Sequence, residues 1–293
     1  MPSLGQRAPL TGPDTPLMRI GRALPPVAIG SFAALAPLPL APLPRDPSDA
    51  SLWLPGQGQA NSCGTTTLAY VLRYQRGEGA PTRPEIDARI RRGDIFTAPP
   101  LLVEYARGLG LAARAYNGAS LDLVKYLVDR QIPVMVLTDT TPLNLRDTAN
   151  LHWVAVVSHG EGRIGVYNPH GFQEELDQAS FEAHWREARI FGLPAWRQFA
   201  IAISRDWSAL PPPTRPRISW YGADLASSGV AGIVNGAIGL RQQIRPTDAR
   251  PSVGDGLRDL GGLLLGTAQS LAGGALLLAG AAAEQLNRRG ASG

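Results

Sequence analysis

The only cysteine of the chain, Cys63, is the residue around which a catalytic site can be built. A cysteine nucleophile needs a base to accept its proton, a group to orient that base, and donors for the oxyanion that forms. Of the four histidines, His159 falls in a predicted turn and His184 on a predicted exposed helix, and both are typical surface positions. His152 opens an apolar stretch just after a polar loop, where it can project from a strand edge into a cleft. His152 is therefore the candidate base.

A predicted hairpin supplies the group that would orient this base. If Val157 pairs with Arg163 across a five-residue loop, His152 lies directly opposite Asn168. Opposed residues project from the same face of a sheet, with Cβ atoms ~5 Å apart. The Asn168 side-chain oxygen can then accept the proton on one ring nitrogen and leave the other nitrogen for Cys63. A register shifted by one residue would instead move Asn168 to the opposite face.

Candidate donors for the oxyanion precede the cysteine. Gln57 lies six residues before Cys63 and carries a side-chain amide, and the backbone N–H of Cys63 would be the second donor. By residue type alone, Gln59 competes with Gln57. Taken singly, a histidine at a strand edge and an Asn-Pro turn are more often structural. Combined with a lone cysteine at a helix start, they favour a catalytic site.

The pattern Gln57-x5-Cys63-Gly64, then His152, then Asn168-Pro169 resembles the papain-like cysteine peptidases. Within them it is most similar to the bacteriocin-processing, double-glycine-leader peptidases and their stand-alone relatives. That family keeps a Gln six residues before a Cys-Gly at a helix start, then a His that opens a late strand. An Asp-Pro follows at the interval that separates His152 from Asn168 here. The resemblance covers about residues 50–205.

The resemblance implies that Gln57 is the oxyanion residue, Cys63 the nucleophile, His152 the base and Asn168 the orienting residue, and it favours Gln57 over Gln59. Two features depart from the family. Its usual Asp is Asn168 here, and a neutral amide orients the ring but stabilises an imidazolium less. The chain also shows neither the membrane domain nor the ATPase of the transporter-fused members, so leader cleavage coupled to export is not expected as its own role.

The helix that carries Cys63 is predicted to begin at the cysteine itself. Asn61 or Ser62 can cap it, because a short side-chain oxygen accepts a hydrogen bond from the first turn. A thiol in that turn lies in the partial positive charge of the helix terminus, which favours the thiolate. One buried face of the helix is indicated by the i, i+3, i+4 spacing of Leu68, Val71 and Leu72.

The remaining pattern predicts helices before strands. Further helices are expected over 84–93, 100–109, 120–130 and 181–188, and strands over 111–116, 133–138, 152–158, 163–168 and 198–204, with a polar loop over 139–150. This order favours an α+β fold. The resemblance implies a papain-like arrangement, in which a helical N-terminal half carries the cysteine and an antiparallel C-terminal sheet carries the histidine and asparagine.

Composition divides the chain into four parts: a Pro-rich disordered arm (1–48), the catalytic domain (49–208), a Pro-rich linker (209–219) and a Gly/Ala-rich helical tail (220–293). The segment 260–283 has no charged residue. As a helix it would be about 36 Å long, which exceeds the ~30 Å core of a bilayer. It therefore suggests membrane association. The alternatives are small-residue helices packed on each other or a low-complexity tail.

Several classes of function lack support. The formal net charge is only +4, and the densest basic cluster, Arg89, Arg91 and Arg92, fits the solvated face of a helix, so no nucleic-acid partner is expected. The one lysine, Lys125, is not in a phosphate-binding loop. A single cysteine excludes an internal disulfide and a multi-thiolate zinc site, and neither His-Glu-x-x-His nor Gly-x-Ser-x-Gly occurs. No metal or cofactor is expected.

Three functions fit these residues. The first is a thiol hydrolase that cleaves a peptide or amide bond of a peptide or protein substrate through an acyl-enzyme on Cys63. The second is an acyltransferase or deamidase that uses the same acyl-enzyme as a secreted bacterial effector. The third is a non-catalytic peptide-binding module. The use of arginine for nearly all basic residues suggests a GC-rich bacterial coding sequence, and either the bacterial cytoplasm or secretion is compatible with it.

Overall fold

The structure is a computed structural model that describes residues 46–56, 61–91, 97–139, 151–190, 193–213, 222–230, 233, 237 and 253–290. All of these belong to the larger of two compact units of the chain, Ala34–Gly293. The predicted arm 1–48 lies outside the described residues apart from its last three positions. Gln57, Gln59, nearly all of the loop 139–150 and the second half of the linker 209–219 also lie outside them.

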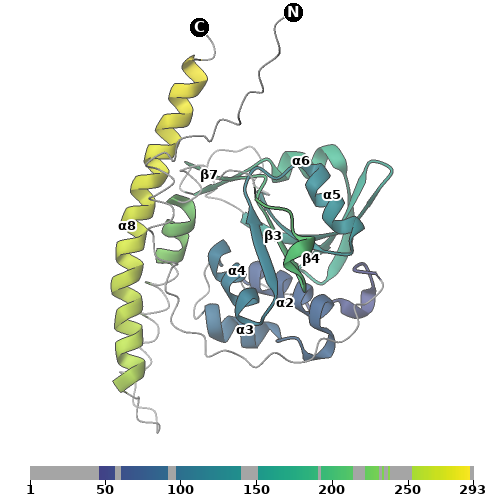
Figure 1. The fold of residues 1–293 in the computed structure, drawn as a ribbon, viewed down its shortest axis with the longest axis horizontal. Helices are drawn as coiled ribbons and strands as arrows, with labels where there is room; N and C mark the ends of the chain where they lie inside the picture. Colours follow the sequence, from purple (N-terminus) through teal and green to yellow (C-terminus); the bar gives the residue numbers. More distant parts are fainter. Residues whose placement is uncertain are drawn as a thin grey trace, which may run out of the picture. The chain divides into compact units, whose positions relative to one another are not determined.

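Helices dominate the first part of the described chain (Figure 1). After the short 3-10 turn η1 (Ala50–Leu52) come α2 (Cys63–Arg76), the turn η2 (Gly77–Gly79), α3 (Arg83–Ile90) and α4 (Pro99–Gly108). The start of α3 follows from its sequence, because Thr82 and Glu85 form a reciprocal capping box and Pro84 occupies the first turn. The three predicted helices in this part of the chain are confirmed.

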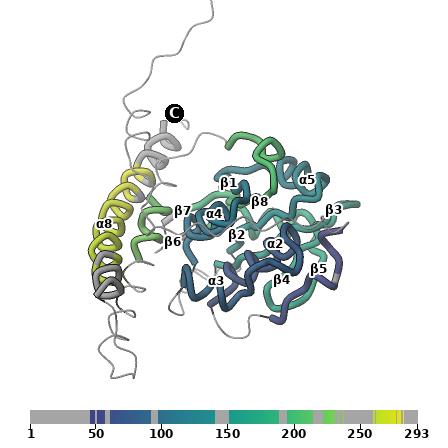
Figure 2. Tube along the Cα trace, turned by 60° about the horizontal axis from the view of Figure 1, so that its bottom comes forward, coloured from purple at the N-terminus to yellow at the C-terminus, as the bar shows by residue number. Residues whose placement is uncertain are grey.

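A six-stranded sheet follows, in the order β1-β8-β2-β3-β4-β5, and every neighbouring pair is antiparallel (Figure 2). Its strands are β1 (Ala112–Tyr116), β2 (Val134–Asp139), β3 (Leu151–Gly160), β4 (Arg163–Asn168), β5 (Phe172–Asp177) and β8 (Ala200–Ser204). Helix α5 (Leu121–Asp129) precedes β2, and α6 (Gln178–Trp185) follows β5. A small hairpin, β6 (Glu187–Ile190) and β7 (Leu193–Arg197), and the turn η3 (Trp207–Ala209) complete this part. The predicted α+β order is confirmed.

The central strands are mainly apolar because both faces of the sheet are covered. On one face, α2 packs on β3, and Thr67 Oγ1 donates to the backbone oxygen of Trp153 at 3.1 Å. On the other face, side chains of α5 and α6 form one buried cluster with alternate strand residues, among them Val124, Leu127, Phe181, Trp185, Val136, Val154 and Val166. This alternation separates Trp153 from Val154 and so fixes which face each residue of β3 occupies.

The β3–β4 hairpin differs from the sequence prediction in its loop and its register. The loop has two residues, Glu161 and Gly162, with φ of 47° and 73°, and Gly160 pairs with Arg163. Positive φ at both positions is the mark of the tight hairpin turn whose twist matches the strands. A bulge then adds one residue to β3 between Val156 and Ser158. The predicted five-residue loop is therefore wrong.

Beyond the bulge, Ala155 pairs with Tyr167, and this register places Asn168 beside Val154. The predicted direct pairing of Asn168 with His152 is wrong by two residues. A shift of two keeps both residues on one face, because side chains alternate with a period of two. Without the bulge the shift would be three, and Asn168 would project from the other face. The extra residue in β3 therefore preserves the juxtaposition that the sequence predicted.

The C-terminal segment forms one long helix, α8 (Val253–Gly290), which includes the uncharged stretch 260–283. Residues 222–230 are also helical and pack closely on it. A Cβ atom on Gly273 would lie 2.2 Å from the backbone nitrogen of Ala226, and one on Gly229 would lie 2.4 Å from that of Ser270. The two helices therefore meet backbone to backbone. This contact confirms the packing of small-residue helices, and it confirms neither a membrane span nor a free tail.

This close approach predicts a sharp difference between two adjacent glycines of α8. Gly273→Ala should push α8 away from residues 222–230, whereas Gly274→Ala meets nothing within 4 Å. Since alanine is the better helix former, Gly274→Ala should stabilise α8 by up to about 1 kcal/mol. Hydrogen exchange should show faster exchange of residues 222–230 only in Gly273→Ala. Equal protection in both variants would contradict the contact.

Candidate active site

Cys63 is the first residue of α2 and is 7% exposed. Ser62 occupies the N-cap position, but its hydroxyl makes no capping hydrogen bond, so the cap predicted for Ser62 is not formed. Burial raises the pKa of the Cys63 thiol, and this effect outweighs the backbone N–H groups of the first turn that favour the thiolate. The predicted lowering by the helix terminus is therefore reversed in the folded chain by loss of hydration.

The Cys63 sulfur lies against the beginning of β3. Hydrogen bonding from the backbone N–H of Trp153, the residue after His152, is the largest effect that opposes the rise of the thiol pKa. The next residue of α2 is a glycine because the strand is so near. A Cβ atom on Gly64 would lie 3.1 Å from Trp153 Cδ1 and 3.0 Å from Thr97 Cβ. The fold thus brings Cys63 to the position in β3 that adjoins His152.

His152 and Asn168 meet as the sequence predicted, although not as directly opposed residues. His152 Nε2 lies 3.3 Å from Asn168 Oδ1. Because a carbonyl oxygen can only accept, Nε2 carries the proton and Nδ1 is left with a free lone pair. Burial lowers the pKa of His152, while the Asn168 contact raises it. The imidazole is therefore neutral and able to accept a proton at neutral pH.

The Asn168 amide is engaged at both ends. It is 8% exposed, and its Oδ1 also accepts from the backbone N–H of His170 at 3.1 Å. Its Nδ2 donates to the carboxylate of Glu174 on β5. Sequence reasoning missed Glu174, because Phe172–Asp177 is too acidic to resemble a strand. Glu174 could have been placed on the same face as Asn168 only if β5 had been predicted from the sequence.

His170, in the turn between β4 and β5, was not assigned a role from the sequence. Its ring stacks on that of His152, with centroids 5.4 Å apart and an interplanar angle of 18°. Its backbone contacts Gly56, where a Cβ atom would lie 2.2 Å from the His170 oxygen. The segment that leads to Gln57 thus lies against the turn that follows Asn168. Gln57 itself is outside the described residues, and its oxyanion role stays a prediction.

Among the described residues, Arg91 is a charged group that acts on the cysteine. Its side chain is only 10% exposed and forms an ion pair with Asp87 at 2.9 Å. Asp87 also accepts from Thr65 Oγ1, in the first turn of α2, at 2.6 Å. The Arg91 charge lowers the pKa of Cys63, against the larger effect of burial. The prediction that the basic cluster forms a solvated face is therefore wrong for Arg91.

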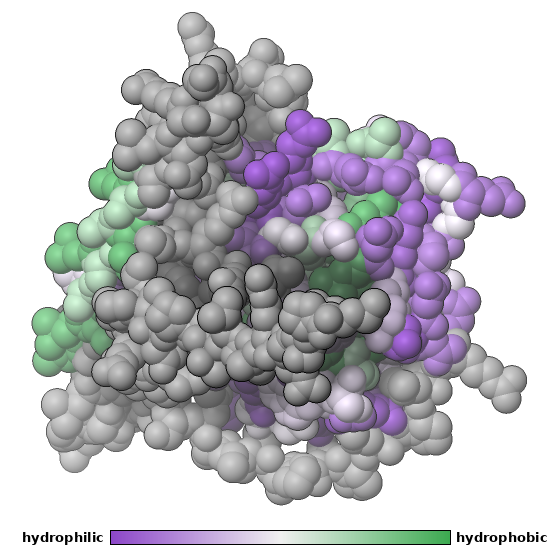
Figure 3. Space-filling model, turned by 45° about the horizontal axis from the view of Figure 1, so that its top comes forward, coloured by the Kyte–Doolittle hydropathy of each residue, from purple (hydrophilic) through white to green (hydrophobic). Residues whose placement is uncertain are grey.

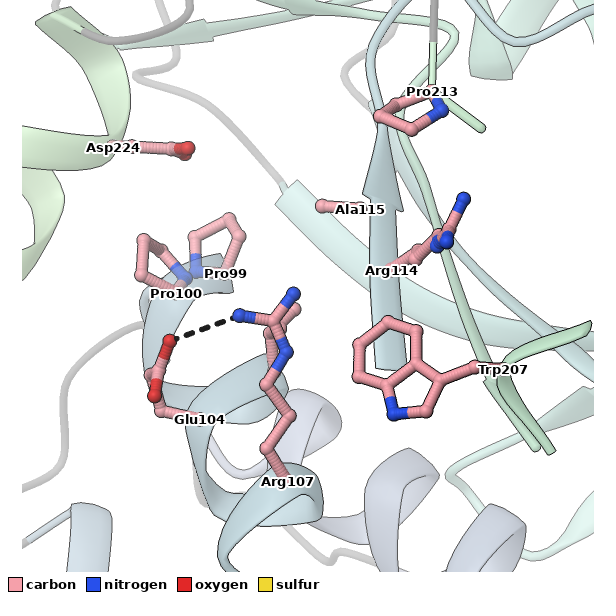
Figure 4. A pocket seen from close by; sticks show the side chains of 10 residues that line it. Pro99, Pro100, Glu104, Arg107, Arg114, Ala115, Trp207, Pro213 and Asp224 are labelled. Carbon is pink, nitrogen blue, oxygen red and sulfur yellow. Dashed lines mark hydrogen bonds and ion pairs between the residues drawn. The ribbon is translucent and has the colours of Figure 1, made fainter. Parts of the chain in front are cut away.

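A pocket of about 320 Å³ lies away from these residues (Figure 4). Two guanidinium groups flank its aromatic wall, with Arg107 and Arg114 at 5.5 and 5.4 Å from the Trp207 ring centroid. Arg107 also pairs with Glu104 at 3.3 Å. The lining contains none of Cys63, His152 and Asn168. Within the described residues, no group of three or more His, Cys, Asp or Glu side chains is placed to hold a metal ion.

No protein-family model matches the chain, and no curated protein matches it. Solved structures do. A C39-like peptidase from Bacillus anthracis has 14% identity and a TM-score of 0.43, covering 54% of this chain and 96% of that one. The peptidase domain of Streptococcus ComA, a bi-functional ABC transporter, has 18% identity and a TM-score of 0.41, covering 53% and 99%. A double glycine motif protease from an AMS/PCAT transporter, in complex with the leader peptide, has 14% identity and a TM-score of 0.37, covering 56% and 98%.

These three structures carry the names of the peptidase group that the motifs of this sequence resemble. The similarity is distant, and it covers little more than half of the chain.

The contacts of His152 predict its titration. Its pKa should lie below the usual value of about 6.5, because burial disfavours the imidazolium. Asn168→Ala should lower it further, since the amide oxygen favours the protonated ring. NMR titration of the ring protons would measure both values. A His152 pKa above its usual value would contradict the burial.

Proposed function

We propose that this chain is a cysteine-dependent hydrolase that cleaves a peptide or amide bond of a peptide or protein substrate. One observation carries the proposal. His152 is hydrogen-bonded through Nε2 to Asn168, at the end of β3 against which the Cys63 sulfur packs. A nucleophile, a base and a group that orients the base are the minimum set for acyl transfer, and the proposal assigns these roles to Cys63 on α2, His152 on β3 and Asn168 on β4.

In this mechanism His152 Nδ1 accepts the thiol proton as the Cys63 sulfur attacks the substrate carbonyl carbon. The negative charge that develops on the carbonyl oxygen is held by the backbone N–H of Cys63 and, as the sequence predicts, by the Gln57 side chain. The tetrahedral intermediate collapses when imidazolium His152 gives its proton to the leaving amine. A water molecule, deprotonated by His152, then attacks the thioester and releases the acid and the free thiol.

Burial favours neutral forms of both Cys63 and His152 when each is considered alone. In the proposed mechanism, proton transfer between them creates both charges together, and each charge then stabilises the other. Arg91 and the N–H of Trp153 favour the thiolate side of this equilibrium. The site can therefore hold a neutral resting pair and form the ion pair as the reaction begins.

Thiol reactivity tests this proposal. Iodoacetamide should alkylate Cys63 well below pH 8, and His152→Ala should slow alkylation and hydrolysis by about 10²–10⁴-fold, because no base accepts the proton. His159→Ala, at a partly buried position of β3 where the ring contacts Asp129, is the matched control and should react like the parent. Labelling only near the ordinary thiol pKa of about 8.5, regardless of His152, would refute a catalytic site.

Products from a peptide library, read by mass spectrometry, would identify the reaction. Cleaved peptides with free carboxylates are the expected result. If the acyl group is transferred to an added amine and no acid forms, the reaction is acyl transfer and not hydrolysis. A gain of one mass unit at Gln would replace it with deamidation. Binding of peptides without any product would leave a peptide-binding module.

We also propose that α8 associates with a membrane surface through one side of the helix. Within the described residues, Gly262–Gly280 is the one stretch long and apolar enough to be a candidate span, and 12% of it is buried. Its exposed side carries an apolar stripe at helical spacing: Leu260, Leu264, Ala268, Leu271, Ala275, Leu278 and Ala282. The buried Gly266, Gly273 and Gly280 lie on the opposite side. Figure 3 shows hydrophobic residues of α8 as a green surface.

Deletion of 218–293 should abolish partition into phosphatidylcholine/phosphatidylglycerol vesicles. Replacing Leu264, Leu271 and Leu278 by glutamine should do the same while the helix remains, because glutamine has a helix propensity close to that of leucine. Vesicle flotation measures partition, and circular dichroism checks the helix. If the parent chain stays in the aqueous fraction, the membrane proposal is wrong.

A further inference from the structure

We propose that Glu174 is a positioning residue for the candidate site: its carboxylate holds the Asn168 amide in the orientation that His152 requires and supplies the negative charge that an asparagine lacks. The inference rests on the proposed function for its catalytic meaning. The contact that carries it is the hydrogen bond from Asn168 Nδ2 to Glu174 Oε1, on the side of the amide away from His152.

Glu174 reaches Asn168 because of the register of β4 and β5. Asn168 pairs with Phe172, and Val166 pairs with Glu174. Residues two apart on a strand share a face, so Glu174 is the diagonal neighbour of Asn168. The next residue, Glu175, projects from the other face and pairs with Arg163 at 4.0 Å. The two adjacent glutamates therefore have separate surroundings.

An asparagine amide can be rotated by half a turn, and its neighbours decide which end faces the histidine. An ionised carboxylate only accepts hydrogen bonds, so Glu174 selects the NH₂ end. The backbone N–H of His170 only donates, so it selects Oδ1 on the other side. The opposite rotation would set oxygen against oxygen at Glu174 and N–H against N–H at His170. Both neighbours thus present Oδ1 to His152 Nε2.

The same contact also brings negative charge close to the imidazole. An aspartate at position 168 would carry that charge itself, whereas an asparagine is neutral. Glu174 is half-buried, so its charge is screened less than that of an exposed residue. It acts through a hydrogen-bonded amide that it polarises. Among the described groups, His170, in the β4–β5 turn, is the other titratable residue that acts on His152.

Glu174→Gln should lower the pKa of His152 by about half a unit to one unit, because an opposite charge nearby is removed. Alkylation of Cys63 at pH 7 should slow by the same factor, about three- to tenfold. Glu175→Gln, on the same strand and the opposite face, is the matched control and should change neither quantity. Both are measured on the full-length chain, by NMR titration of His152 and by iodoacetamide kinetics across pH.

A double substitution separates this role from a general loss of structure. Asn168→Asp alone places two carboxylates in contact and should lower the melting temperature. Asn168→Asp combined with Glu174→Gln restores one charge and one donor, so the His152 pKa and the alkylation rate should return to at least their original values. No rescue, or a His152 pKa unchanged in Glu174→Gln, would overturn the inference.

The two proposals fail in different ways. If Cys63 of the parent chain reacts like an ordinary thiol and yields no product, the hydrolase is wrong. The His152 titration still tests Glu174, since it needs neither substrate nor a reactive thiol. If instead the parent chain is reactive while the glutamate variants match it in both readouts, the hydrolase stands and Glu174 is only a surface carboxylate.

Discussion

Side-chain alternation in two neighbouring strands is the constraint on which the candidate site depends. A residue of β3 can meet one of β4 only if both project from the same face, and the register that decides this is set at the hairpin. In this chain the tight turn at Glu161 and Gly162 would by itself separate the pair, and the bulge next to Val157 reverses that outcome. The contact between His152 and Asn168 therefore depends on an irregularity several residues away from it.

Burial is the second condition that the site must satisfy. Removing a thiol and an imidazole from water disfavours the charged form of each, and nearby polar groups in fixed positions stabilise those charged forms. Backbone N–H groups and Arg91 act on the sulfur side, while Asn168 and Glu174 act on the histidine side. Two of these groups are held by a second contact, Arg91 by Asp87 and Asn168 by the His170 N–H. Such a shell restrains the reacting groups before a substrate arrives.

Local sequence signals predicted most of the helices and strands, whereas features that depend on contacts between distant parts of the chain were not predicted. Ser120 caps α5, with its hydroxyl accepting from Leu123 N–H at 3.1 Å, and such a cap can be predicted because capping depends on adjacent residues alone. The bulge in β3 has no comparable signal, so the register was predicted two residues away from where it lies. β5 was missed because it is an acidic edge strand, and Glu174 was missed with it. The burial of Arg91 depends on packing that no local pattern records.

The turn after β4 joins parts of the site that would otherwise be independent. Its residues 168–171 include the asparagine that orients His152, the ring that stacks on it, and the backbone that touches Gly56. Any side chain at position 56 would displace that turn. His152 and the segment that leads to Gln57 thus both contact the same turn. A substitution that moves one of them would also move the other, which restricts how far the sequences of the loops on this side of the molecule can diverge.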